Sequence, residues 1–368
     1  MRNKVISVLF CLLLAAGILT SIILPDKYYS ETEKRTLKQF PAVTLADIRS
    51  GKFGDSIEVY LADQFPGRNI WVTVKTLADR ASGKTEIGGV YFAKDGYLIE
   101  TNKSTNARQT SVNLAALKQL SDKLEKSGVT VKIMLVPTAS TVLSDKLPAF
   151  AQTMDQAAII EQAKKEGLNV VDVTGALSAH KDEYIFYMTD HHWTSLGAYY
   201  AYAAWMTGKG AAVDSLSAWT HETLCDNFRG TTYAKVNYPF AGYDTIDAYY
   251  KSPTHKVDYN GGNYVTDSIY ERKYLNGSDQ YATFFNSNQS TTVAYGNGEG
   301  KLLILKDSYA NCFAQFCVDD FAETHLIDMR FFRSSVQKYV EENGITEVLV
   351  LYNIPNFISD SGIANCAR

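Results

Sequence analysis

The sequence predicts an α/β protein built on a parallel sheet. Short apolar segments such as "VTVKIMLVPT" alternate with amphipathic segments that end at a glycine, such as "SVNLAALKQLSDKLEKSG". Apolar residues three and four apart, followed by a glycine, are typical of a helix and its end. Strands separated by such helices indicate parallel crossovers. The 368 residues suffice for one large domain with an insertion or for two ordinary domains.

The expected elements follow in order along the chain. A helical segment interrupted at Pro66-Gly67 comes first, and the next helix ends at Gly128 before the strand "VTVKIMLVPT". A helix closed by Gly167 then leads into the strand "LNVVDV". The carboxyl-terminal part repeats the alternation as "KLLILKDS", "YANCFAQFC", "THLIDM", "SSVQKYVEENG" and "TEVLVLYN". Residues 209–300 are rich in Tyr, Asn and Gly, which predicts hairpins and loops inserted between two halves of one sheet.

The N-terminus predicts a membrane anchor. Arg2 and Lys4 precede an uncharged run of 20 residues, Val5–Leu24. A helix of that length rises about 30 Å, the hydrocarbon thickness of a bilayer. The run is longer than the usual core of a cleaved signal peptide, so residues 1–25 are expected to stay as a signal-anchor, with a removed signal peptide as the alternative. The basic residues before the run favour a cytoplasmic N-terminus and an extracytoplasmic C-terminal part.

The rest of the chain is expected as a stalk, residues 26–56, and a domain, residues 57–368. The net charge of −4 and the pI near 5.9 give no indication of nucleic-acid binding, which would need a basic stripe. Cys312 and Cys317 have neither metal-site nor CxxC spacing, and the five cysteines are interpreted as small apolar fillers. Many of the 24 tyrosines lie in the insertion. They suit the binding of sugar rings and equally suit packing across strands.

The first candidate for chemistry is Ser308 in "LLILKDSYANCF". It falls where a buried strand turns into a helix, which is the position of a nucleophile elbow. The helix N-terminus there would stabilise a negative oxygen beside the serine. The alternative is that Asp307 and Ser308 only cap the helix.

The second candidate is "TDHHWT". A serine nucleophile needs a base, and the base needs an acceptor that fixes its tautomer. In an extended chain Asp190 and His192 share a face, while His191 points away. Metal binding is disfavoured because adjacent histidines of a strand face opposite ways. A purely structural histidine pair at the start of a helix near Thr194 stays an alternative.

Taken together, these stretches resemble the DHHW family of bacterial envelope proteins. The chain is also similar to the wider group of SGNH-hydrolase-like O-acetyltransferases that includes the alginate acetylation proteins. The resemblance extends from about residue 60 onward. It rests on "DQFPGR", "FAKDGYLIE", "VPTASTVLSDKLP", "YMTDHHWTSLGAYYAY", "FRGTTYAK", "LKDSYANCF" and "LYNIPNF".

The resemblance implies a flavodoxin-like three-layer fold. It also implies Ser308 as nucleophile, His192 as base and Asp190 as orienting acid, in the order of the acetyltransferase group, where D-x-H precedes the serine. Unlike the hydrolases, the chain has "KDSY" rather than a glycine-led block at the serine. Further oxyanion or substrate contacts are expected from a set of four residues. They are Tyr309, Gly230, Asn353 and Arg229.

The expected function is transfer of an acyl group, taken to be acetyl, to an envelope or exported polysaccharide. A membrane-bound acyltransferase is the implied acyl donor, and no cofactor or metal is expected. Two alternatives stay open. The same triad could remove acetyl groups as an esterase, or the protein could be a non-catalytic binding or scaffolding protein that holds glycan through its tyrosine-rich insertion.

Overall fold

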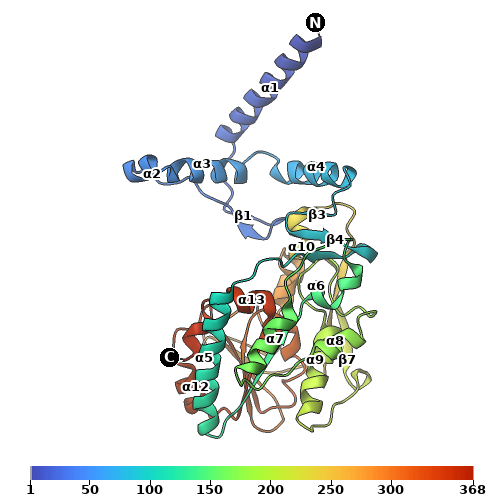
Figure 1. Ribbon diagram of the computed structural model, residues 1–368, viewed down its shortest axis with the longest axis vertical. Coiled ribbons are helices and arrows are strands. Elements are labelled where there is room, and N and C mark those ends of the chain that lie inside the picture. Colours follow the sequence, from blue (N-terminus) through green and yellow to red (C-terminus); the bar gives the residue numbers. More distant parts are fainter. Residues whose placement is uncertain (1, 368) are drawn as a thin grey trace. The chain divides into compact units, whose positions relative to one another are not determined.

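The structure, a computed structural model, describes residues 2–367, without the side chains of residues 2, 3, 9, 10, 13, 14, 18 and 22. The chain forms two compact units (Figure 1). The first unit is Met1–Gly88 with Tyr233–Phe240, and the second is Gly89–Thr232 with Ala241–Arg368. The residues expected as a stalk, 26–56, belong to the first unit.

The first unit is mostly helical. Pro66-Gly67 does interrupt a helical segment, because Gly67 takes a left-handed conformation with a φ of 67°. No helix formed by the described residues is long and apolar enough to cross a membrane, so the span predicted for Val5–Leu24 is not supported. The elements of this unit are α1 (Arg2–Ile23), β1 (Tyr29–Ser30), β2 (Arg35–Thr36), α2 (Leu45–Ser50), α3 (Lys52–Asp63), α4 (Arg68–Ala81) and β3 (Glu86–Ile87).

The second unit is organised around a seven-stranded sheet in the order β10-β9-β11-β13-β12-β14-β6. Its strands are β6 (Thr130–Val136), β9 (Val257–Tyr259), β10 (Tyr264–Thr266), β11 (Thr291–Tyr295), β12 (Lys301–Lys306), β13 (Glu323–Asp328) and β14 (Glu347–Asn353). Neighbouring strands among β13, β12, β14 and β6 run parallel. Strands β11, β9 and β10 pair antiparallel.

The sheet is therefore mixed, and the prediction of a parallel sheet is correct only for its four-stranded half. The reason is that residues 209–300 do not lie outside the sheet, since they supply its antiparallel edge. The segment "LNVVDV" is not a strand either, because it forms only a parallel bridge between Val170 and Ile133. The remaining strands form hairpin-like pairs outside the large sheet: β4 (Val90–Phe92) with β5 (Leu98–Glu100), and β7 (Thr220–Phe228) with β8 (Asp244–Tyr250).

Helices cover both faces of the sheet, giving three layers. On one face, leucines of α5 such as Leu120 pack with Leu303 and Val350 of the strands. On the other face, Trp205 of α9 and Phe313 of α11 pack with the opposite side of the same strands. The helices of this unit are α5 (Ala107–Lys126), α6 (Ala139–Val142), α7 (Gln156–Lys165), α8 (Thr174–Ala179), α9 (Ser195–Gly208), α11 (Tyr309–Ala314), α12 (Val336–Asn343) and α13 (Ile354–Ser359), while α10 (Thr231–Val236) lies at the unit boundary.

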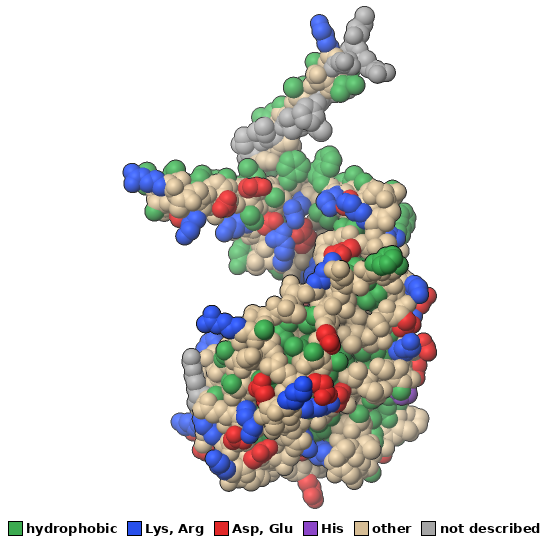
Figure 2. Space-filling view, viewed as in Figure 1, with side chains coloured by type: hydrophobic (Ala, Val, Ile, Leu, Met, Phe, Trp, Pro, Cys, Tyr) green, Lys and Arg blue, Asp and Glu red, His purple; other side chains and the backbone are tan. Residues whose placement is uncertain are grey.

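The interpretation of the five cysteines as small apolar fillers holds for three of them, because Cys312, Cys317 and Cys366 are buried. Cys11 is exposed and Cys225 is partly buried, and all five are free thiols. Acidic and basic side chains are mixed over the face of the second unit seen in Figure 2, with no continuous basic stripe on that face. Several tyrosines of the insertion are buried in the core, among them Tyr259 and Tyr270. Packing thus accounts for part of the tyrosine enrichment.

Candidate active site

Ser308 stands at the carboxyl end of β12, at the start of α11. The turn that presents it is held by Asp307, which is buried. One Asp307 oxygen accepts from Tyr309 N at 2.9 Å. The other accepts from Asn353 N at 3.0 Å, Asn353 Nδ2 at 2.7 Å and Asn356 Nδ2 at 3.0 Å. Asp307 therefore ties the turn after β12 to the turn after β14, and burial raises its pKa to about 6.

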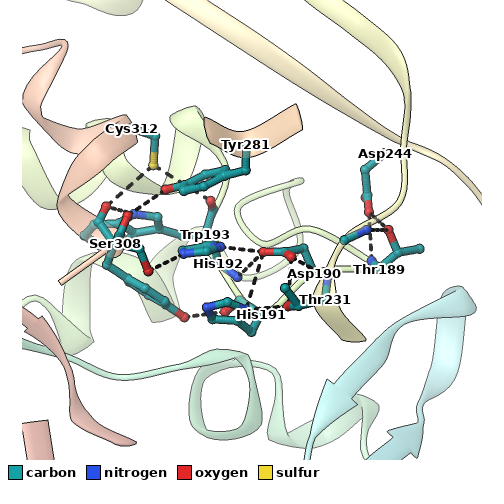
Figure 3. Close-up of polar contacts among 12 residues, drawn as sticks. Thr189, Asp190, His191, His192, Trp193, Thr231, Asp244, Tyr281, Ser308 and Cys312 are labelled. Atoms are coloured by element: carbon teal, nitrogen blue, oxygen red, sulfur yellow. Dashed lines mark hydrogen bonds and ion pairs between the residues drawn. The ribbon is translucent and has the colours of Figure 1, made fainter. Parts of the chain in front are cut away.

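Ser308, His192 and Asp190 form one line of hydrogen bonds (Figure 3). Ser308 Oγ lies 2.7 Å from His192 Nε2, and His192 Nδ1 lies 2.5 Å from Asp190 Oδ1. Because a carboxylate only accepts, His192 carries its proton on Nδ1 and leaves Nε2 bare for the serine hydroxyl. A serine, a neutral imidazole and an orienting carboxylate in this order can activate a nucleophile.

The Asp190 carboxylate is buried and fully hydrogen-bonded. Besides His192 Nδ1, it accepts from His192 N at 3.0 Å. It also accepts from Thr231 N at 2.7 Å and Thr231 Oγ1 at 2.9 Å. Burial acts to raise its pKa, but the charges of His191 and His192 and these hydrogen bonds hold the pKa of Asp190 well below its usual range. The carboxylate thus stays ionised beside His192.

His192 is held neutral by its surroundings. Its side chain is buried beneath the ring of Tyr281, which stacks on it at 3.9 Å between centroids and 14° between planes. Burial, and after it the neighbouring His191, lower the pKa of His192 to about 4. A neutral imidazole at ordinary pH is the form that can accept a proton from Ser308.

The pairing of Asp190 with His192 was predicted, but the reason given for it is wrong. Residues 187–192 are not an extended strand, because they form a bend closed by a bridge between Phe186 and Trp193. His191 does stay outside the line to Ser308. Its ring does not point to an opposite face, however, since it lies 3.8 Å from the His192 ring between centroids.

Two residues of the insertion region, Asp244 and Gly230, contact the bend that carries Asp190 and fix its position. Asp244 accepts from Met188 N and Thr189 N, both at 2.8 Å, and from the hydroxyls of Thr189 and Tyr184. Gly230 approaches Asp190 so closely that an added Cβ would lie 2.2 Å from the carboxylate. Only glycine therefore fits at this position without displacing Asp190.

The four further residues expected to contact substrate or oxyanion have their donors engaged elsewhere. Tyr309 donates its N–H to Asp307 and its hydroxyl to His191 O. Gly230 N donates to Thr189 Oγ1 at 3.2 Å, and the Asn353 amide donates to Asp307. The Arg229 guanidinium donates to backbone oxygens of residues 241 and 242. In this arrangement they support the site and do not point donors at Ser308.

Sequence reasoning missed Thr231, Tyr281 and Asp244. Thr231 touches Asp190 and Tyr281 touches His192. Asp244 accepts hydrogen bonds from the backbone of residues 188 and 189 in the same bend. All three lie in or beside the insertion, far along the chain from residue 190. The only signal for them was "FRGTTYAK", which contains Thr231 and was singled out for Gly230.

A cavity opens beside this line of residues, within the second unit. It lies at the carboxyl ends of β14 and β6, next to β12. Most of the residues that line it have polar side chains, and Asp190 and His191 form its wall on the side of the bend. Sites at the carboxyl ends of parallel strands are usual in α/β proteins.

Asp190, His191 and His192 also bring potential metal-ligand atoms within 4.8 Å of one another. The argument that adjacent histidines face apart is wrong here. However, Nδ1 of His192 is engaged by Asp190, and Nδ1 of His191 lies 2.5 Å from Thr231 Oγ1. A metal at this position would have to displace the hydrogen bonds that order the three residues.

Solved structures share this fold. A DHHW family protein from Eubacterium siraeum superposes with a TM-score of 0.65 at 28% identity, covering 76% of this chain and 95% of that chain. PatB1 of Bacillus cereus, solved with a sulfonyl adduct, superposes with a TM-score of 0.61 at 19% identity, covering 74% of this chain and 98% of that chain. At that identity the likeness to PatB1 shows the fold alone.

Sequence comparison adds a curated relative and a family. The chain is 27% identical over 177 residues to the probable alginate O-acetylase AlgJ of Pseudomonas syringae pv. tomato. The match covers 45% of this chain and 44% of AlgJ, so the chain spans less than half the length of that relative. The family model of DHHW proteins matches residues 73–327, which include the bend and Ser308. The chain belongs to the DHHW protein family.

Proposed function

We propose that this chain transfers an acetyl group to a hydroxyl of a polysaccharide outside the cytoplasm, with Ser308, His192 and Asp190 as its catalytic triad. The observation that supports this most is the line of hydrogen bonds from Ser308 Oγ to His192 Nε2 and from His192 Nδ1 to Asp190. Capping alone does not explain this arrangement, because Ser308 makes no side-chain cap bond to α11.

In the first half of the reaction, Ser308 Oγ attacks the acyl carbon of the donor while His192 Nε2 takes the hydroxyl proton. The bond from the acyl carbon to the donor oxygen then breaks, and His192 returns the proton to that oxygen. Asp190 stabilises the imidazolium without becoming protonated. The partial positive charge at the start of α11 favours the oxyanion that forms beside Ser308.

In the second half, a hydroxyl of the acceptor attacks the acyl-serine. His192 takes the proton of that hydroxyl and passes it to Ser308 Oγ as the bond from Oγ to the acyl carbon breaks. The result is an ester on the acceptor and a free serine. Water in place of the acceptor would make the protein an esterase.

The choice of acetyl and of a polysaccharide is supported by the likeness to AlgJ, whose name is that of a probable alginate O-acetylase. Acyl coenzyme A is not available outside the cytoplasm. The acetyl group would then have to be handed over by a membrane-bound acyltransferase, which we propose as the partner of this chain.

A serine-directed fluorophosphonate probe tests the proposal on the purified full chain. The probe should label the wild type, and Ser308→Ala should abolish both labelling and turnover of p-nitrophenyl acetate. Ser127→Ala, at the exposed end of α5, serves as matched control and should be labelled like the wild type. Retained turnover in Ser308→Ala, or an unlabelled and inactive wild type, contradicts the proposal.

A further inference from the structure

His191 belongs to the same bend as the proposed triad but has a different partner. Its Nδ1 lies 2.5 Å from Thr231 Oγ1. That same Thr231 oxygen lies 2.9 Å from Asp190 Oδ2. Asp190, Thr231 and His191 therefore form a second line of hydrogen bonds, which starts at the carboxylate that also orients His192.

The position of each proton in this second line follows from the chemistry of its members. A carboxylate can only accept, so the single hydroxyl proton of Thr231 is donated to Asp190. Thr231 Oγ1 can then only accept from His191, which places the proton of a neutral His191 on Nδ1. The second ring nitrogen, Nε2, is left as a bare hydrogen-bond acceptor.

Both bare nitrogens point to the same side of Asp190. Nδ1 of His192 lies 2.5 Å from Asp190 Oδ1, and Nδ1 of His191 lies 3.7 Å from the same oxygen. The rings run side by side, 3.8 Å apart between centroids and tilted by 37°, and Figure 3 shows both on the same side of the carboxylate. Since Nε2 lies across the ring from Nδ1, the two Nε2 atoms both face away from Asp190. That of His192 meets Ser308.

His191 lines the cavity beside the triad, and its side chain is 25% exposed. The other polar side chains of the lining are amides and hydroxyls, including Asn102, Thr138, Ser140 and Asn356, together with the carboxylates of Glu100 and Asp190. Among the described residues that line the cavity there is no Lys or Arg. A wall of this kind offers hydrogen bonds to hydroxyl groups rather than a cation to an anionic group.

Two of these lining residues are already ordered by their neighbours. Thr138 Oγ1 and Ser140 Oγ lie 3.0 Å apart. The buried Gln156 amide donates to both oxygens, at 2.8 and 3.2 Å. Such a network fixes the side chains before a ligand arrives, which reduces the entropy lost on binding.

We propose that this cavity is the subsite of a sugar acceptor, and that His191 Nε2 accepts a hydrogen bond from the hydroxyl adjacent to the one that is acylated. This inference rests on the proposed function. The reacting hydroxyl gives its proton to His192, as in the second half of the reaction above. The vicinal hydroxyl keeps its proton and donates it to His191, which makes His191 a positioning residue that selects a vicinal diol over a single hydroxyl.

Two substitutions at His191 separate this role from a structural one. His191→Asn keeps an N–H at the position of Nδ1, and so keeps the bond to Thr231, but it loses the acceptor at Nε2. His191→Gln can place its carbonyl oxygen at the position of Nε2, but it loses the bond to Thr231. A positioning role predicts that Asn is the more damaging substitution, whereas a purely structural role predicts the reverse.

The measurement is acetyl transfer from p-nitrophenyl acetate, on the full chain, to 1,2-cyclohexanediol and to cyclohexanol. The wild type should use the diol about tenfold better, as one directed hydrogen bond allows. His191→Asn should reduce this preference to near one, and His191→Gln should keep most of it. As a control, His180 lies elsewhere in the unit and is partly exposed, so His180→Asn should behave as the wild type. The reverse order of the two His191 variants, or a wild type without preference, overturns the inference.

A second measurement does not depend on activity. Nitrogen-15 NMR of the imidazoles should show neutral His191 with its proton on Nδ1. A proton on Nε2 would overturn the inference even in an active enzyme. Retained turnover in Ser308→Ala would instead refute the proposed function and would leave the His191 tautomer as a separate result.

Discussion

The ring of Tyr281 lies flat against the imidazole of His192, with 3.9 Å between centroids and 14° between planes. Its hydroxyl donates to Ser308 O at 3.0 Å. A single tyrosine of the insertion thus contacts both the proposed base and the backbone of the proposed nucleophile. It seals one face of the imidazole from water and limits its rotation.

Substitution of Tyr281 separates these two contacts. Tyr281→Phe keeps the stacked ring and loses one hydrogen bond, so we expect a loss of less than about tenfold in kcat/KM for p-nitrophenyl acetate. Tyr281→Ala removes the ring, opens a cavity of aromatic size and should cost about 3–5 kcal/mol of stability, with a larger loss of kcat/KM. Equal rates for the two variants would show that the stacked ring does not matter.

The pH dependence of activity should report the neutral state of His192. Its pKa is lowered from 6.5 to about 4, by burial first and then by His191. The acidic limb of kcat/KM should accordingly lie near pH 4 and not near pH 6.5. Esterase rates measured from pH 3.5 to 8 check this, and a limb near pH 6.5 would contradict it.

The same pKa has a consequence for stability. Between pH 6.5 and about 4 the unfolded chain protonates this histidine while the folded protein keeps it neutral. The contribution of the neutral His192 is therefore complete above pH 6.5 and is lost as the pH falls toward 4. In His192→Gln, stability should decline less over this range than in the wild type, as thermal unfolding at each pH would show.

Asp307 should stabilise the turn that presents Ser308. Its carboxylate accepts four hydrogen bonds, three of them on one oxygen. In Asp307→Asn an amide N–H must face a donor at one of the two oxygen positions, whichever way the amide turns. Leaving buried donors unpaired should cost about 1–3 kcal/mol, measured as a loss in the free energy of unfolding.

Asp122 of α5 is the matched control for that experiment, since its side chain is half-exposed and pairs with Lys118 on the same helix. Asp122→Asn should change stability by less than about 0.5 kcal/mol. If Asp307→Asn were equally mild, the connection between the turns after β12 and β14 would not depend on this carboxylate.

The sequence was sufficient to predict the site residues that belong to local motifs, but not those that reach the site from a distant part of the chain. Asp190 and His192 are two residues apart, and Ser308 follows an apolar run that ends where a helix begins, so these positions could be found without the fold. Thr231 and Tyr281 meet the bend only because the insertion folds back over it. No periodicity near residue 231 or 281 indicates that contact.

The sheet shows the same division. Strands β12, β13 and β14 and the helices between them were predicted from periodicity and glycine stops, which are local signals. The antiparallel edge was missed because β9 and β10 are three residues each, and they join the sheet only through the pairing of β9 with β11, about 30 residues further along the chain. Short strands of this kind derive their conformation from their partners rather than from their own sequence.

Gly230 packs against Asp190 without room for a side chain. Nothing about the φ of Gly230 demands glycine, because it is not among the residues with a positive φ. Glycine is required here for steric reasons, since a Cβ at position 230 would lie 2.2 Å from Asp190 Cβ and from Asp190 Oδ2. Gly230→Ala must therefore displace the carboxylate, or the backbone of residues 229–231, by more than side-chain flexibility allows.

We expect Gly230→Ala to lower stability by about 1–3 kcal/mol, as overpacking of a buried site does. Because the displaced carboxylate also orients His192, kcat/KM for p-nitrophenyl acetate should fall by about a hundredfold or more, which is the loss expected when a catalytic group is misplaced by roughly 1 Å. Gly175→Ala is the matched control, since Gly175 lies in α8 with nothing within 4 Å of an added Cβ. The control should keep wild-type kcat/KM and should gain up to about 1 kcal/mol of stability from the lower entropy of the unfolded chain. If Gly230→Ala kept wild-type activity, the position of Asp190 could not control the base, and the proposed triad would have to be abandoned.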